Sequence, residues 1–228
     1  MGGRHRGAGQ SGDDVPAAGA VGVAAQKKTL VAREQNPAAR AAWRIAAAGL
    51  NPADLVFLDE TSTPTTLTPR RARAPRGQRV MGRVPRGRWE AITLVATLTA
   101  TGPGPAVVLP GALDRIAFET YVAEVLVPEL RPGQTVILDN LSVHKSATAQ
   151  RLIEAAGCDL RFLPTYSPDF NPIENAFAKL KQPLRRAEAR TFDAVVPATG
   201  RGLDAITPSD ARGYFAAAGF PLPPGQPL

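Results

Sequence analysis

Two aspartates each close a run of aliphatic residues. Asp59 ends the run LVFLD and Asp139 ends the run TVILD. Short apolar runs of this kind predict buried strands, and ligands collect at strand ends in α/β sheets. If the two strands are neighbours and parallel, both carboxylates project from one sheet edge, where their oxygens suit Mg²⁺ or Mn²⁺. The alternative for either residue alone is an acid that marks where the strand returns to water.

A third acid, Glu174, stands in the segment SPDFNPIENAF, at the predicted start of a helix. It lies about 100° from Ile173 around the helix, at the border of the apolar face, and so is placed to point at a sheet edge. Lys181 and Arg185 follow on the same flank and suit phosphates. The alternative is a capping box, in which Asn171 caps the helix and Glu174 satisfies backbone amides.

Other polar residues near these acids have weaker assignments. Asn140 could orient a metal ligand or contact a phosphate, and Lys145 adds a positive charge close by. His144 could hydrogen-bond a phosphate or a metal-bound water, or it simply begins a helix without a chemical role. Alternation along the strand should turn Glu60 away from Asp59, which leaves it at most an accessory residue.

The turn before the third acid carries Asp169, for which a turn-stabilising role is favoured over metal binding. Three aromatic residues could stack on nucleobases, but core packing is the favoured interpretation. They are Trp89, Tyr166 and Phe177.

The elements that must position these residues follow from periodicity and from turn signals. Helices are expected over residues 37–48 (Trp43 and Ile45 inward), 114–130, 144–156 and 172–186, and strands over 55–58, 91–101, 106–110, 135–139 and 159–164. Helical spacing continues from Phe192 to Ile206, but Pro197, Gly200 and Gly202 interrupt it. The order predicts an α/β fold, a central mixed sheet covered by helices.

Arginine is concentrated in one segment. Between Arg70 and Arg88 there are eight arginines and no acid, whereas the whole 228-residue chain has a net charge of +7. The rest of the chain is therefore close to neutral. Such a segment is typical of a phosphate-binding surface, although a solvated basic loop is the alternative. The candidate DNA-binding residues are Arg70, Arg71, Arg73, Arg76, Arg79, Lys145, Lys181 and Arg185.

Composition excludes several other classes of protein. A hydrophobic fraction of 44% and a charged fraction of 21% fit a globular protein. Cys158 is the only cysteine, which excludes an internal disulfide and suits a reducing cytoplasm. No run approaches the roughly 20 apolar residues of a membrane span, and no signal peptide is evident. We expect a cytoplasmic protein whose residues 1–26, rich in Gly and Ala, are disordered.

Three segments together carry a family resemblance. LVFLDET, VILDNLSVHKS and LPTYSPDFNPIENAFAKLK resemble the signature blocks of D-D-E transposases, closest to bacterial insertion-sequence members of the Tc/mariner superfamily. The 34 residues between Asp139 and Glu174 match that superfamily's spacing. The similarity extends over residues 27–220.

The resemblance implies a ribonuclease H-like fold with Asp59, Asp139 and Glu174 as catalytic acids. It also implies two Mg²⁺ or Mn²⁺ ions, with Asp59 bridging both and each other acid completing one coordination shell. Two ions so held stabilise the attacking and leaving oxygens of an in-line displacement at phosphorus. Water would first free a 3′-hydroxyl at the end of an insertion sequence, and that hydroxyl would then attack target DNA.

The implied partners are element-end and target DNA, and a second copy of the chain on paired ends, in the cytoplasm and associated with the nucleoid. The implied organisation is a disordered segment (1–26), a linker helix (27–50), the catalytic domain (51–190) and a C-terminal helical tail (191–228). Because the superfamily's helix-turn-helix region has no counterpart here, a separate DNA-binding polypeptide from an upstream reading frame is expected to recognise the element ends.

Two other functions share the basic segment. One is a truncated, catalytically idle DNA-binding remnant of a transposase, which the intact set of three acids argues against. The other is a host ribonuclease H-like nuclease without strand transfer, which the SPDFNPIE block argues against.

Overall fold

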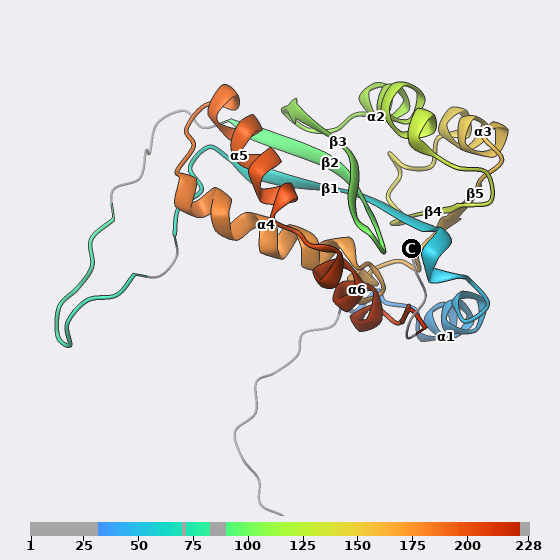
Figure 1. Cartoon of the computed structure of the whole chain (residues 1–228), viewed down its shortest axis with the longest axis horizontal. Coiled ribbons are helices and arrows are strands. Elements are labelled where there is room, and N and C mark those ends of the chain that lie inside the picture. The colour runs from blue at the N-terminus through green and yellow to red at the C-terminus, as the bar shows by residue number, and fades with distance from the viewer. Residues whose placement is uncertain (1–31, 70–71, 83–89, 224–228) are drawn as a thin grey trace, which may run out of the picture. The chain divides into compact units, whose positions relative to one another are not determined.

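A five-stranded mixed sheet, in the order β3-β2-β1-β4-β5, forms the centre of the protein (Figure 1). The computed structural model describes residues 32–69, 72–82 and 90–223. The strands are β1 (Leu55–Pro64), β2 (Ala91–Thr99), β3 (Gly102–Pro110), β4 (Thr135–Leu138) and β5 (Asp159–Phe162). The two pairs β1–β2 and β2–β3 are antiparallel, and the two pairs β1–β4 and β4–β5 are parallel.

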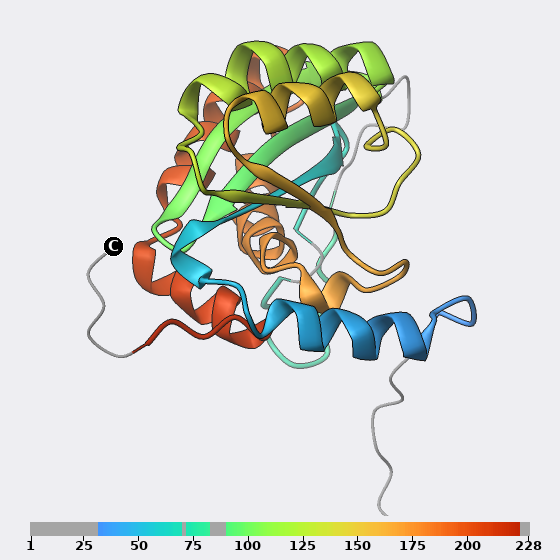
Figure 2. The same ribbon diagram turned by 90° about the vertical axis from the view of Figure 1, so that its right-hand side faces the viewer.

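Helices cover both faces of this sheet, as Figure 2 shows. They are α1 (Pro37–Ala47), α2 (Arg115–Tyr121), α3 (Ala147–Ala155), α4 (Ile173–Ala187), α5 (Phe192–Asp204) and α6 (Pro208–Ala217). Short helical turns precede β1 (η1, Pro52–Asp54) and α4 (η4, Pro168–Phe170). Two more, η2 (Val122–Leu126) and η3 (Val127–Glu129), extend α2. The predicted order of elements is confirmed. No helix among these residues is both long and apolar enough to cross a membrane.

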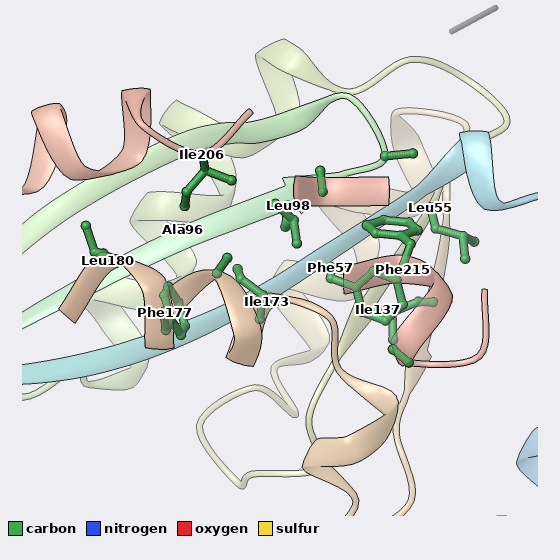
Figure 3. Packing of buried hydrophobic residues seen from close by; sticks show 14 of the residues in the cluster. Leu55, Phe57, Ala96, Leu98, Ile137, Ile173, Phe177, Leu180, Ile206 and Phe215 are labelled. Carbon is green, nitrogen blue, oxygen red and sulfur yellow. The ribbon is translucent and has the colours of Figure 1, made fainter. Parts of the chain in front are cut away.

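Strand β1 separates two hydrophobic clusters. Leu55 and Phe57 face the cluster that contains α4, α5 and α6, whereas Val56 and Leu58 face the cluster formed with α2 and α3. Figure 3 shows the first cluster, with Phe57 beside Phe215 and Ile137. Since successive side chains of a strand point to opposite faces, a strand covered on both sides is apolar throughout. This explains the uninterrupted run before Asp59.

The pairing of β1 with β4 brings the two aspartates together. The strands are parallel, and Phe57 is opposite Ile137. Asp59 and Asp139 each follow two residues later, so they occupy matching positions on the face that carries Phe57 and Ile137. The condition stated from the sequence, that the two strands are neighbours and parallel, is confirmed.

Helix α5 continues through Pro197, contrary to the expected interruption. One of its glycines permits close packing instead, because a Cβ on Gly202 would lie 2.3 Å from Cδ1 of the fully buried Leu180 in α4. Residues of α5 and α6, including Ala198 and Phe215, belong to the same core cluster as β1. Burial against the sheet and α4 therefore outweighs the weak intrinsic helix propensity of this segment.

Helix α1 differs from expectation in its buried face. Trp43 packs against the core as predicted, but Ile45 is 79% exposed, so the prediction that it points inward was wrong. The buried residue is Arg40, whose guanidinium binds Asp169 and lies over the ring of Phe170. The ion pair with Asp169, in the turn η4, therefore accounts for the orientation of this alanine-rich helix.

Candidate active site

Asp59 is a buried carboxylate in the middle of β1, 8% exposed. Its Oδ1 accepts a hydrogen bond from the backbone N–H of Glu60, and its Oδ2 accepts one from Nδ2 of Asn171, both at 2.8 Å. Asn171 is also buried and precedes α4. The amide therefore ties the start of α4 to the first aspartate.

The environment of Asp59 raises its pKa to about 8. Burial is the main cause, and the negative charges of Glu60, Asp139 and Glu174 add to it. The carboxylates expected to act together are therefore electrostatic neighbours. Holding all of them ionised requires positive charge to be brought to this edge of the sheet.

Asp139 lies just after β4 and is bound to a buried histidine. Its Oδ1 is 2.5 Å from Nδ1 of His144 and accepts a hydrogen bond from the backbone N–H of Leu141 at 3.1 Å. The other ring nitrogen of His144, Nε2, is 2.9 Å from Oε2 of Glu60. His144 is 1% exposed, and Phe118 packs against its ring.

These contacts fix the charge of His144. Burial disfavours the imidazolium, but hydrogen bonding to Asp139 and Glu60 outweighs that penalty and raises the pKa of His144 to about 10. The predicted helix start at His144 was wrong, because α3 begins three residues later with Ser146 as its cap. A buried ion pair, which local propensity does not reveal, holds this residue inside the protein.

Glu174 lies in the first turn of α4, with an exposed side chain. The helix has Pro172 as its N-cap and no side-chain capping hydrogen bond. The capping-box alternative is therefore not observed, and Asn171 binds Asp59 instead of the helix end. Glu174 is left facing a cavity.

That cavity, of about 310 Å³, lies beside the sheet edge. It is lined by residues 139–142 after β4, residues 163–168 after β5, Asn171 and Glu174. Asn140 joins the two loops, since its Nδ2 donates to Oγ1 of Thr165 at 3.1 Å. Asp139 and Glu174 thus share one concave surface.

The loop after β5 carries an exposed aromatic residue. Tyr166 lines the cavity, is 53% exposed and has a φ of +55°, which is unusual for a residue other than glycine. The core-packing interpretation was wrong for Tyr166 and is confirmed for Phe177, which is 3% exposed. Trp89 lies outside the described residues.

Hard oxygen donors gather at this edge, but they do not form a closed cage. Within the residues described, no group of three or more His, Cys, Asp or Glu side chains is close enough to be a complete metal site. Mg²⁺ is commonly bound by one or two carboxylates together with substrate phosphates, which suits an open arrangement. Ionised carboxylates around Asp59 repel one another, and a divalent cation bound beside them would offset that repulsion.

The chain matches the family model for the DDE superfamily endonucleases over residues 54–196. This range contains all three acids and the whole sheet. The chain belongs to this family. Comparison with proteins of curated function gave no match.

Solved structures share the fold of this DDE endonuclease domain. The Mos1 strand transfer complex matches with a TM-score of 0.67 and 17% identity over 87% of this chain and 64% of the Mos1 chain. The Mos1 mariner paired-end complex with Mn matches with a TM-score of 0.66 and 15% identity over 86% of this chain and 64% of the Mos1 chain. The Mos1 transposase catalytic domain with raltegravir and Mg matches with a TM-score of 0.57 and 13% identity over 79% of this chain and 85% of the Mos1 chain.

These comparisons confirm the ribonuclease H-like fold predicted from the sequence. The chain spans 64% of the length of the first two Mos1 chains.

The candidate DNA-binding residues are only partly placed in this family member. Arg73, Arg76 and Arg79 are exposed in the segment 72–82, and Lys145 is exposed beside the loop after β4. Lys181 and Arg185 are half-buried on α4. Arg70 and Arg71 lie outside the described residues.

Sequence reasoning missed two contributors to the site. Asn171 was considered only as a helix cap, although a short polar side chain before a helix can equally reach a neighbouring strand. Glu60 was predicted to point away from Asp59, which the two-sided packing of β1 supports, but its contact with His144 was not foreseen. No local sequence signal marks either contact, because each joins residues that are far apart in the chain.

Proposed function

We propose that this chain is the catalytic part of a transposase, in which Asp59, Asp139 and Glu174 act on DNA phosphodiesters. One observation carries the proposal: the parallel register of β1 and β4 puts two of these acids at one sheet edge, and Glu174 shares a cavity with Asp139. Membership of the DDE endonuclease family supports it.

Asp59, Asp139 and Glu174 are the residues that would hold Mg²⁺ or Mn²⁺, two ions in the arrangement expected for this family. When bound, the metal supplies positive charge that stabilises the attacking and leaving oxygens in displacement at phosphorus. Structures of Mos1 with Mn and with Mg support the choice of cation.

The protein's own groups keep the carboxylates in place. Asn171 donates to Oδ2 of Asp59 and so favours one orientation of that buried acid. Asn140 fastens the loop after β4 to the loop after β5, so the wall of the cavity is held from both sides. Preorganised groups of this kind lower the reorganisation needed when the phosphate arrives.

The substrates proposed are element-end DNA, whose cleavage frees a 3′-hydroxyl, and target DNA, which that hydroxyl attacks. The Mos1 strand transfer and paired-end complexes support strand transfer by a dimer on paired ends. The exposed Arg73, Arg76 and Arg79, together with Lys145, are proposed to contact phosphates. Recognition of terminal repeats by a separate polypeptide stays a prediction.

The proposal is tested by incubating the chain with supercoiled plasmid DNA and Mg²⁺ or Mn²⁺. We expect metal-dependent nicking and, with an added 3′-hydroxyl DNA end, joined products. Asp139→Asn should lose at least about 100-fold in rate, since it removes a charge aimed at the reacting centre. Equal activity in the variant would refute the proposed site.

The remaining outcomes separate the other two functions. DNA binding without nicking in either metal would indicate an idle remnant. Nicking without joined products would indicate a nuclease.

A further inference from the structure

The loop between β4 and α3 sends His144 back into the protein, against two carboxylates from different strands. We infer that Glu60, acting through His144, is a positioning residue for Asp139. The inference rests on the proposed function, because it treats Asp139 as a metal ligand. It assigns a role to Glu60, which does not face the cavity that Asp139 and Glu174 line.

The contacts define a continuous chain of three side chains. Nδ1 of His144 lies 2.5 Å from Oδ1 of Asp139, and Nε2 lies 2.9 Å from Oε2 of Glu60. An ionised carboxylate has no hydrogen to donate, so a ring held between two of them carries a hydrogen on each nitrogen. The contact with Asp139 is a hydrogen bond, and the contact with Glu60 is an ion pair. His144 can then hold one ring orientation.

The surroundings prevent the ring from leaving that position. His144 is 1% exposed, and the ring of Phe118 in α2 packs against it with centroids 5.0 Å apart. Beyond the ring, Ser146 binds Glu119 of α2 and caps α3. The loop is therefore anchored on the α2–α3 side of the sheet, where alternation also places Glu60.

The consequence falls on Asp139. Its Oδ1 is occupied by His144 and by the backbone N–H of Leu141, while the carboxylate is a third exposed and lines the cavity. Oδ2 is thereby left as the oxygen available to a ligand. Partners of this kind, one step behind a metal ligand, typically change metal affinity or activity by about 10- to 100-fold.

A histidine that served packing alone would need neither carboxylate. Glu60 has no other ion-pair partner among the described residues. Its Oε2 is buried and has no aligned hydrogen bond, so the contact between Glu60 and His144 is an ion pair. Burying charge is costly, and fixing the geometry of a neighbouring group is the role that we infer for this pair. The neighbour here is the second acid of the site.

The test measures Mn²⁺ affinity by calorimetry on the full chain with a short DNA duplex, and stability by urea unfolding. We expect Glu60→Gln to weaken Mn²⁺ binding about tenfold while the protein remains folded, and His144→Gln to weaken it by about 10- to 100-fold. The double variant should bind as His144→Gln alone does, because Glu60 acts only through the ring.

Glu119→Gln is the matched control. It removes another partly buried carboxylate that anchors the same loop, through Ser146, but it does not touch His144. The amide oxygen of Gln can still accept from Ser146, so the loop stays anchored and the Mn²⁺ affinity should stay within about twofold of wild type.

Three results would overturn the inference. They are unchanged Mn²⁺ affinity in folded Glu60→Gln, an equal loss in Glu119→Gln, and additive losses in the double variant. If His144→Gln does not fold, Glu60→Gln still decides the matter, since it keeps the ring. Wild-type protein that takes up no Mn²⁺ with DNA present would overturn the proposed function as well.

Discussion

At the scale of single residues, Asn171 shows how a buried carboxyl group is accommodated. Its amide donates to Oδ2 of Asp59 at 2.8 Å, and both side chains are almost without solvent contact. A buried carboxylate without a hydrogen-bond donor destabilises the folded protein by the full free energy of its desolvation. The amide is thus part of the reason that an acid can occupy the middle of β1.

Asn171→Asp should lower the free energy of unfolding by at least about 1–3 kcal/mol at neutral pH, because it replaces a donor by an acceptor next to Asp59. Urea unfolding monitored by circular dichroism measures the change. Asn175→Asp is the control, since the same substitution then lies on an exposed position in the first turn of α4, where an acid is tolerated or favourable. Equal stability of the two variants would contradict this account of Asn171.

Asp169 gives a prediction that depends on pH. Its carboxylate accepts from both Nη1 and Nη2 of Arg40, at 2.8 and 2.6 Å, and this hydrogen bonding lowers the pKa of Asp169. Because the pKa of Asp169 is lower in the folded protein than in the unfolded chain, where it is about 3.9, its ionisation stabilises the folded protein at any pH above the unfolded pKa. This stabilisation is lost as the pH falls through the folded pKa. The pair joins α1 to the turn that precedes the site.

Asp169→Asn should therefore destabilise the protein at pH 6–7 and lose that effect as the pH is lowered below about 4. Urea unfolding of both proteins across this range measures the difference. A difference that stays constant with pH would show that the contact does not depend on the charge of Asp169.

At the scale of elements, the contact between α4 and α5 depends on one glycine. A Cβ on Gly202 would meet Cδ1 of Leu180 at 2.3 Å, whereas a Cβ on Gly200 would have nothing within 4 Å. The two positions lie in the same helix, so their intrinsic preferences are alike. Only the packing differs.

Gly202→Ala should destabilise the protein by about 1–3 kcal/mol, because the fully buried Leu180 has little space to move. Gly200→Ala should instead stabilise it by up to about 1 kcal/mol, the usual gain of alanine in an exposed helix interior. Thermal and urea unfolding measure both. The same sign of effect at both positions would contradict the packing described for α4 and α5.

The elements also show what could be predicted from the sequence. The apolar runs before Asp59 and Asp139 predicted β1 and β4, and the apolar face of α4 predicted its burial, since these signals are local. The inward face of α1 and the course of α5 through Pro197 could not be predicted. They depend on Asp169 and on the core beneath α5, which are distant in the chain.

The same distinction applies to the candidate site. Residue type and position at the end of an apolar run marked the acids. The predicted strand end at Asp59 was wrong, because β1 continues to Pro64. The positions of Asn171, Glu60 and His144 depend on which strands and helices meet, which the sequence does not state directly. The parallel register of β1 and β4 brings Asp59 and Asp139, which are far apart in the sequence, to the same edge of the sheet.

At the scale of the whole molecule, positive charge is concentrated in one segment of an otherwise nearly neutral chain. Arg73, Arg76 and Arg79 in this segment are exposed. Removing one arginine that binds a phosphate should reduce the slope of log affinity against log salt by about 0.9. The salt dependence of duplex binding thus reports directly on this segment.

Replacing Arg73, Arg76 and Arg79 by Ala should flatten that slope by about 2–3, as measured by fluorescence anisotropy over a range of salt concentrations. The control replaces Arg115, Arg151 and Arg212, which are exposed on α2, α3 and α6, and should leave the slope nearly unchanged. A slope unaffected by the first substitution would remove the segment from the DNA interface.

The most direct measurement is anomalous diffraction at the manganese absorption edge from crystals grown with Mn²⁺ and a DNA duplex. The account predicts anomalous peaks within coordination distance of Asp59, Asp139 and Glu174, with Oδ2 of Asp139 as a ligand. Peaks located elsewhere, or no peak at this sheet edge while DNA is bound there, would contradict it.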